Sequence, residues 1–365
     1  MTANKTEHYL VLDAARGIAA LAVFIYHLKT FVFPDIKVPG ILTLSSSYLA
    51  VDLFFLMSGI VLSKAYETRI KNEEMSFLRF MKVRFLRLYP LYFLGLALGL
   101  GYMIIKAFID AEPVDAAANL GRSLTLNLFF LPDFWNGKDI FIFNPASWSL
   151  SLEWIINIIF VLALVKFNNK ALIVVTILSG AALAYLGFEN QNIDLGWSGE
   201  NFDGGLARIA FSFTLGIFIY RLLQNPRLKL ISWSGGMTLA LLVCLLFALI
   251  HPPSWTSVYY DFFLVYIFFP TFCFLSCNAV TPQLLSKAFS VLGQVSYALY
   301  ILHTPLILWF AGFWKFFAGD DIQGAASISL PFIIILVCLT SYLATVLFDA
   351  PIRKIMSGIL KKNAH

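Results

Sequence analysis

Long apolar stretches, separated by short polar segments, run along the whole chain. A helix needs about 20 mostly apolar residues to cross the hydrocarbon core of a bilayer. Ten stretches approach or reach that length, and they are residues 10–28, 48–66, 88–108, 147–166, 171–188, 205–223, 231–250, 258–279, 290–313 and 327–349. Backbone groups inside a bilayer must be hydrogen-bonded within the protein, so each stretch is expected to be helical. The pattern predicts an all-α polytopic membrane protein with about ten transmembrane helices.

Shorter features of the pattern refine this topology. Residues 120–132 are apolar but short, which favours a re-entrant or surface segment. The first span contains Asp13 and Arg16 and no small-residue cleavage site follows it, so a signal peptide is not expected. The longest extramembrane piece is about 107–146, and no internal repeat is evident. We expect a single transmembrane domain over residues 1–365, with no appended soluble domain.

Composition and charge agree with this interpretation. The chain has 365 residues, of which 59% are hydrophobic and only 13% are charged, whereas soluble domains have about 25% charged residues. If the N-terminus is cytoplasmic, 18 of the 26 lysines and arginines fall in cytoplasmic segments. Basic residues concentrate on the cytoplasmic side of membrane proteins, so both termini are predicted to be cytoplasmic. The net charge of +5 therefore indicates topology and gives no reason to expect nucleic acid as a partner.

Ionisable residues inside the spans are the functional candidates, because each is costly there without a partner or a cavity. Arg16 and His27 are eleven residues apart on the first span, which places them on one helix face about 16 Å apart. The alternative is that Arg16 reaches the headgroups and His27 lies at the interface. Asp52, near the start of the second span, is at a depth similar to that of His27 and could orient its imidazole. It could equally be an exposed boundary residue.

Three further sites carry the same ambiguity. Glu153 shares a helix face with Ser149, and it is either a functional acid or an ordinary helix-start acid. Arg84 and Arg87 are three residues apart at the expected cytoplasmic surface, where they could clamp phosphates or simply mark topology. His303 precedes Pro305, whose ring frees a carbonyl near residue 301, so this histidine could be satisfied by the broken backbone.

Metal chemistry has little support in the sequence. The four cysteines lie in apolar stretches and form no short-spaced set with histidine; they are Cys244, Cys273, Cys277 and Cys338. They are therefore expected to be packing residues, and no metal is expected as a cofactor.

Taken in order, these residues resemble the acyltransferase 3 family of bacterial membrane acyltransferases, which includes surface-glycan O-acetyltransferases. Arg16 and His27 match its arginine, ten residues, histidine signature. Four further matches are Asp52–Gly59 (DLFFLMSG), Arg84–Pro90 (RFLRLYP), Trp148–Glu153 (WSLSLE) and Ser296–His303 (SYALYILH). Together the five motifs cover nearly the whole chain.

Two departures from the family pattern are visible. The first motif has Ala14 or Ala15 where the family usually has glycine, a small-for-small change. Some members carry a hydrolase-like domain after the membrane part, whereas this chain ends at His365. We therefore expect it to complete transfer alone or with a partner protein.

The resemblance implies a multi-pass protein of the bacterial inner membrane. It moves an acyl group, expected to be acetyl, from cytoplasmic acetyl-CoA to a hydroxyl of a surface glycan such as lipopolysaccharide, or of a lipid-linked saccharide. His27 is the expected general base, Asp52 or Glu153 orients it or the acceptor, and Arg16 stabilises negative charge on the donor. A covalent acyl-histidine is left open as a variant.

The same resemblance suggests where the two substrates bind. Arg84 and Arg87, with Arg16, are expected to hold the CoA donor. The residues expected to contact substrate are Trp148, Ser149, Tyr297 and His303.

Two rival functions remain open at this stage. A flippase or transporter of lipid-linked saccharides would also place charges in the membrane, but it would favour helix breaks at matching places in two halves, and none is evident. A membrane glycosyltransferase would use acidic motifs in an outer loop. Trp135, Trp197 and Trp255 either stack on sugars or belong to the aromatic belt at the membrane surface.

Overall fold

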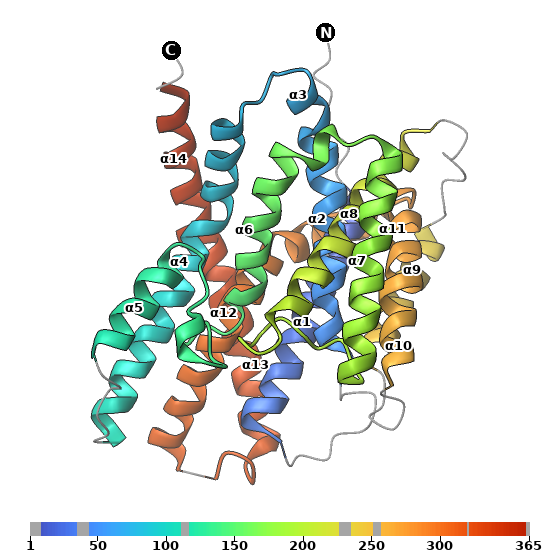
Figure 1. Ribbon diagram of the computed structural model, residues 1–365. Helices are drawn as coiled ribbons and strands as arrows, with labels where there is room; N and C mark the ends of the chain where they lie inside the picture. Colours follow the sequence, from blue (N-terminus) through green and yellow to red (C-terminus); the bar gives the residue numbers. More distant parts are fainter. Residues whose placement is uncertain are drawn as a thin grey trace.

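The chain folds into a bundle of long helices that run roughly side by side (Figure 1). The computed structural model describes residues 9–34, 44–110, 117–225, 235–250, 257–319 and 321–362. Over these residues the regular structure is entirely helical, which confirms the predicted all-α class. Residues 231–234 of the predicted seventh span, and Trp255, lie outside the described residues.

Eight helical segments of the described chain are long and apolar enough to cross a membrane. They are Leu10–Val32, Ser47–Lys71, Phe77–Ile109, Asn169–Asn190, Phe202–Leu223, Val258–Cys277, Gln283–Ala318 and Ala326–Gly358. Two shorter apolar helices, Ser147–Leu162 and Gly235–Leu249, correspond to the remaining two predicted spans. All ten predicted spans thus coincide with helices, eight of them of full crossing length.

The helices carry the labels of Figure 1. The first half comprises α1 (Leu10–Val32), α2 (Ala50–Leu62), α3 (Thr68–Lys71), α4 (Phe77–Asp110), α5 (Ala117–Leu128), α6 (Ser147–Leu162) and α7 (Asn169–Asn190). The second half comprises α8 (Phe202–Leu223), α9 (Gly235–Leu249), α10 (Val258–Phe262), α11 (Phe269–Cys277), α12 (Ser286–Ala318), α13 (Ala326–Leu343) and α14 (Ala350–Lys362). The short apolar stretch expected near 120–132 is largely α5, which lies beside α4 at the edge of the bundle (Figure 1).

The start of α1 and the end of α14 lie at the same end of the bundle, the top of Figure 1. We call this the terminal end and the other the opposite end. The shared end is what an even number of crossings requires. Which end faces the cytoplasm stays a prediction.

Three of the spans are continuous through π-helical turns. These turns are Ser63–Glu67 between α2 and α3, Phe263–Phe268 between α10 and α11, and Ala344–Asp349 between α13 and α14. A π-turn inserts one residue into the helix and rotates the face that follows it.

Two close helix pairs form the centre of the bundle, α1 with α12 and α2 with α8. On α1, the side chains of Ala14, Ala15, Ala19 and Ala20 are fully buried. On the other pair, a Cβ added at Gly59 would lie 2.2 Å from the carbonyl oxygen of Phe213, and one added at Gly216 would lie 2.2 Å from that of Leu56. Small residues let helix backbones approach closely where lipid supplies no hydrophobic drive for association. These two pairs position the polar residues described next.

Candidate functional site

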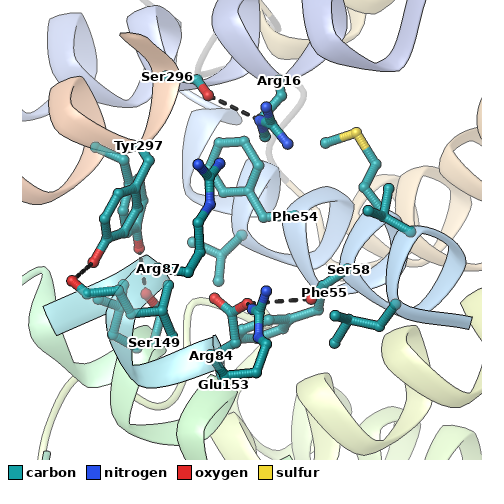
Figure 2. A pocket seen from close by; sticks show the side chains of 17 residues that line it. Arg16, Phe54, Phe55, Ser58, Arg84, Arg87, Ser149, Glu153, Ser296 and Tyr297 are labelled. Carbon is teal, nitrogen blue, oxygen red and sulfur yellow. Dashed lines mark hydrogen bonds and ion pairs between the residues drawn. The ribbon is translucent and has the colours of Figure 1, made fainter. Parts of the chain in front are cut away.

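A cavity opens between α1 and α12 on one side and α2 on the other, and α4 and α6 complete it. It encloses about 900 Å³ of space free of protein atoms, its open mouth included. Three arginines converge on it (Figure 2), and we call it the arginine cavity. Its polar lining consists of Arg16, Ser58, Arg84, Arg87, Ser149, Glu153, Ser296, Tyr297 and Tyr300.

Two of the three arginines are held by protein partners. Arg84 donates to the Glu153 carboxylate over 2.6 Å, and Ser58 donates to the same carboxylate oxygen over 3.2 Å. Arg16 donates to Ser296 Oγ and to the Gly293 carbonyl, each over 2.8 Å, and pairs with Asp13 over 3.0 Å. These contacts fix the direction of both guanidinium groups.

Arg87 is different, because it makes no hydrogen bond or ion pair within the described part of the chain. Its positive charge acts on Arg16 across the cavity and on Arg353 of α14. The charge of Arg87 also acts on the carboxylate of Asp349, which makes its ion pair with Arg353. A partly buried guanidinium that has no ion pair of its own attracts an anion. The cavity as a whole has three cations in its lining and one carboxylate.

Several residues expected to contact substrate line this same cavity. Ser149 Oγ and the Tyr300 hydroxyl are 2.7 Å apart. Tyr297 donates its hydroxyl proton to the Leu88 carbonyl over 2.6 Å. Trp148 instead lies outside the cavity lining, with its ring 5.4 Å from the guanidinium carbon of Arg208.

His27 and His303 form a direct pair just beyond the arginine cavity. His303 Nε2 is 3.2 Å from His27 Nδ1, and the ring centroids are 5.0 Å apart. Tyr300, which lines the cavity, has its ring 5.9 Å from that of His303. His303 is fully buried, so the structure places it against His27 rather than on an open surface.

The backbone around this pair fixes which ring nitrogens carry protons. His303 Nδ1 faces the carbonyls of Tyr300 at 2.6 Å and Leu299 at 3.2 Å. A carbonyl only accepts, so His303 Nδ1 carries the hydrogen and its Nε2 offers a lone pair. His27 Nδ1 faces the Val23 carbonyl at 3.0 Å and His303 Nε2. His27 Nδ1 therefore also carries the hydrogen, and the lone pair of neutral His27 is on Nε2.

The carbonyl freed by Pro305 has a different partner from the one considered for His303. Asn144 donates its amide to the Ile301 carbonyl over 2.7 Å, so the helix break links α12 to the residues that precede α6. His303 itself uses the intact carbonyls of the preceding turn.

Asp52 lies in a buried ion pair with Arg208 of α8. The guanidinium Nη2 is 2.7 Å from Asp52 Oδ2, and both side chains are almost completely buried. Arg208 also donates to the Leu195 carbonyl over 2.7 Å and to the Tyr48 carbonyl over 2.9 Å. In the structure the Asp52 carboxylate therefore pairs with Arg208, and His27 contacts His303.

Arg208 belongs to none of the five motifs, so they do not identify it as a site residue. The available signal was its position inside the predicted span 205–223, where an arginine needs a buried acid. His303, by contrast, was named as a candidate, but its contact with His27 joins helices 276 residues apart in sequence.

No cluster of three or more histidine, cysteine or acidic side chains able to hold a metal ion occurs among the described residues. The four cysteines are all unpaired thiols, three of them at least partly buried.

Comparison with known proteins places these features in a family. A model described as an acyltransferase domain, that of the acyltransferase 3 family, matches residues 9–349. The chain is 34% identical over 194 residues to "Protein 2 in picA locus" of Rhizobium radiobacter, a match that covers 50% of this chain and 96% of that protein. It is 35% identical over 149 residues to acyltransferase MdmB of Streptomyces mycarofaciens, covering 39% of this chain and 36% of that one.

A longer match has lower identity. The chain is 23% identical over 374 residues to O-acetyltransferase OatA of Staphylococcus aureus, covering 94% of this chain and 57% of OatA. The chain therefore spans little more than half of OatA and about a third of MdmB. No solved structure matches.

Proposed function

Because the chain belongs to the acyltransferase 3 family and is therefore an acyltransferase, we propose that it moves an acetyl group from acetyl-CoA to a hydroxyl of a cell-surface glycan or lipid-linked saccharide. The observation that carries this proposal is an arginine-lined cavity within the bundle, beside a histidine pair with an assigned lone pair. The protein would act in the bacterial inner membrane, with its terminal end in the cytoplasm.

The donor side of the proposal rests on charge. CoA brings several phosphate groups and a long, thin pantetheine arm. Arg87, which has no carboxylate partner, and Arg84 would bind the phosphates, because guanidinium groups bind phosphate through paired hydrogen bonds. Arg16, fixed by Ser296 and Gly293, would add a third positive charge for the phosphates of the donor. Tyr300 and Ser149 would then lie along the path from the phosphates to His27.

The chemical step is assigned to His27 Nε2. It takes the proton of the acceptor hydroxyl while the hydroxyl oxygen bonds to the thioester carbon. The carbon–sulfur bond then breaks, and the departing CoA thiolate takes the proton from His27. His303 acts as a positioning residue, because its Nε2 accepts from His27 Nδ1 and stabilises the imidazolium that forms during the step.

The two acids receive supporting roles in this scheme. Glu153 holds the Arg84 guanidinium at the cavity wall. Asp52 holds Arg208 and so fixes α2 against α8. Trp148, over Arg208, belongs to the same support.

The test uses purified protein in lipid nanodiscs, radiolabelled acetyl-CoA, and the saccharide fraction extracted from the membranes of the source bacterium. Replacing His27 with alanine or glutamine should lower transfer by about 100- to 10,000-fold, the usual contribution of a general base. CoA binding, followed by thermal shift, should stay within about twofold. Thr30→Ala, an exposed substitution on the same helix, is the matched control. Near-full transfer by His27→Ala would reject the assignment.

The covalent variant predicts a different result in the same system. If His27 Nε2 attacks the thioester itself, label should accumulate on the wild-type protein without acceptor and should be absent from His27→Ala. A protein that binds no CoA would instead support the rival function, a flippase of lipid-linked saccharides.

A further inference from the structure

A second pocket lies at the opposite end of the bundle, away from the arginine cavity. It has about 970 Å³ of empty space, its opening included. The segment between α7 and α8 forms most of its wall, and the starts of the second and eighth spans complete it. We call it the amide pocket, after Asn190, Gln191, Asn192 and Asn201, which line it together with Asp194 and Trp197.

The chemistry of this lining differs from that of an anion site. Four carboxamides and two carboxylates lie in the lining, and among the residues that the structure describes no lysine, arginine or histidine joins them. Asn190, Gln191 and Asn192 each donate to a backbone carbonyl through the amide nitrogen, which leaves one amide hydrogen of each for a ligand. Such a surface suits hydroxyl groups, which both donate and accept, and it repels phosphate. Trp197 is 49% exposed, so its indole face is available to stack on the apolar C–H face of a sugar ring.

The pocket wall is preorganised rather than loose. Asn201 Oδ1 accepts from the backbone nitrogens of Gly196 and Ser198 at 2.9 and 3.0 Å. The Trp197 indole N–H donates to the Asp194 carbonyl over 3.0 Å. The indole is therefore held in place before any ligand arrives, which lowers the entropic cost of binding.

The pocket floor connects it to the histidine pair. Asp261, almost fully buried, accepts from the Tyr48 hydroxyl over 2.7 Å and from the Ile193 backbone nitrogen over 3.1 Å. The Tyr48 ring lies 6.4 Å from that of Tyr26, which meets the His27 ring edge-on at 5.3 Å. One aromatic layer, that of Tyr26 and Tyr48, thus separates the amide pocket from His27.

We propose that the amide pocket binds a sugar unit of the acceptor, on the far side of the Tyr26–Tyr48 layer from His27, and so holds the saccharide beside the reaction site. The proposal rests on the proposed function and specifies its second substrate site. Trp197 provides the stacking surface, and the carboxamides and Asp194 contact sugar hydroxyls. The acceptor and the donor would then reach His27 from opposite ends of the bundle.

The first test measures binding alone, without acetyl-CoA, so that it does not depend on the acyl-transfer reaction. The probe is the membrane saccharide fraction of the source bacterium, and bound sugar is quantified on the immobilised full-length protein in nanodiscs. Trp197→Ala should weaken retention by about tenfold, the loss expected for one aromatic stacking contact. Trp197→Phe, which keeps a flat ring, should retain most of the binding.

The matched control is Trp135→Ala. Trp135 is 75% exposed at the same end of the bundle, and it is not among the residues that line the amide pocket. Equal retention by Trp197→Ala and Trp135→Ala would overturn the proposal, and so would a wild-type protein that retains no saccharide.

A second measurement separates this proposal from the donor chemistry. In the transfer assay, Trp197→Ala should raise the KM for the saccharide fraction about tenfold and leave the Kd for CoA unchanged. A wild-type protein that retains saccharide but transfers no acetyl group would reject the proposed reaction and leave the sugar site standing. A variant that loses kcat with an unchanged KM would reject the sugar site.

Discussion

The arginine cavity and the amide pocket are opposite in chemistry. The first is built from helix faces and has three arginines and one glutamate in its lining. The second is built largely from the segment between α7 and α8, and its described lining has two aspartates and no cation. Under the proposed function, the positive cavity would bind the phosphate-bearing donor and the amide pocket would bind the neutral sugar. His27 and His303 lie between the two.

The largest effect is expected from disrupting the buried Arg208–Asp52 pair. Arg208 supports the amide pocket through the carbonyls of Leu195 and Tyr48, both of which line it. Arg208→Ala leaves the buried Asp52 carboxylate without a cation, so it should lower the free energy of unfolding by about 3–5 kcal/mol. Chemical denaturation in detergent micelles measures this loss.

A matched substitution shows whether the effect is specific to the buried pair. Arg122→Ala removes a half-exposed arginine that pairs with buried Asp133, and it should cost clearly less. Equal losses in the two variants would show that Arg208 is an ordinary ion-pair residue. Saccharide binding should fall in Arg208→Ala even under conditions where CoA binding persists.

Removing two arginines of the arginine cavity should change the affinity for CoA and leave the amide pocket unaffected. Arg84→Ala combined with Arg87→Ala should weaken CoA binding by roughly 100-fold or more, because each guanidinium contributes a charge-assisted hydrogen bond. Isothermal titration with CoA measures the change, and retention of the saccharide fraction should not move.

The control for this prediction is a second double substitution on the same helix. Arg79→Ala with Lys82→Ala removes two exposed charges from α4, so the charge change is identical. A similar loss of CoA affinity in the control variant would indicate that CoA is attracted by the overall positive charge and does not bind in the arginine cavity.

Between the two regions, His303→Phe should lower kcat by roughly 10- to 100-fold, because the imidazolium of His27 loses a hydrogen-bond acceptor. The affinities for CoA and for saccharide should remain as in the wild type. His303→Gln, whose amide oxygen accepts, should recover part of the rate. A rise in KM without a fall in kcat would assign His303 to substrate contact instead.

The smallest effect is expected at Asp194, in the wall of the amide pocket. Burial raises the pKa of this carboxyl to about 6 from 3.8, with nearby Arg208 opposing the shift and Asp261 adding to it. Between pH 4 and 6 the folded protein keeps a proton that the unfolded chain has lost, so the stability contribution of Asp194 falls as pH rises through this window.

Asp194→Asn removes that titration. The melting temperature of the variant minus that of the wild type should therefore increase by a few degrees from pH 4 to pH 7. Scanning fluorimetry measures both temperatures. Asp203→Asn, at the start of α8, provides the comparison. A constant difference across the pH range would contradict the raised pKa.

The sequence predicts the spans well because transmembrane helices are set by local apolar length. The grouping of Arg16, Arg84, Arg87 and Glu153 into one cavity was only partly predictable, since the motifs name the residues but not their distances. The position of Arg208 inside a span predicts that it needs an acidic partner. Neither the identity of that partner nor the His27–His303 contact is predictable, because both depend on which helices pack together. In α2, Asp52 has a depth that fits either partner, and only the packing against α8 decides.

The α2–α8 contact also has a consequence for how the protein is made. An isolated α8 would enter the membrane with an unpaired arginine, at a cost of roughly 2.5–3.5 kcal/mol. Asp52 is synthesised 156 residues earlier, so α2 must remain available in the bilayer until α8 arrives. The two helices can approach this closely because Gly59 and Gly216 have no side chain at the contact. In a chain where α2 and α8 do not pair, Arg208 is therefore left as a lone charge within the membrane.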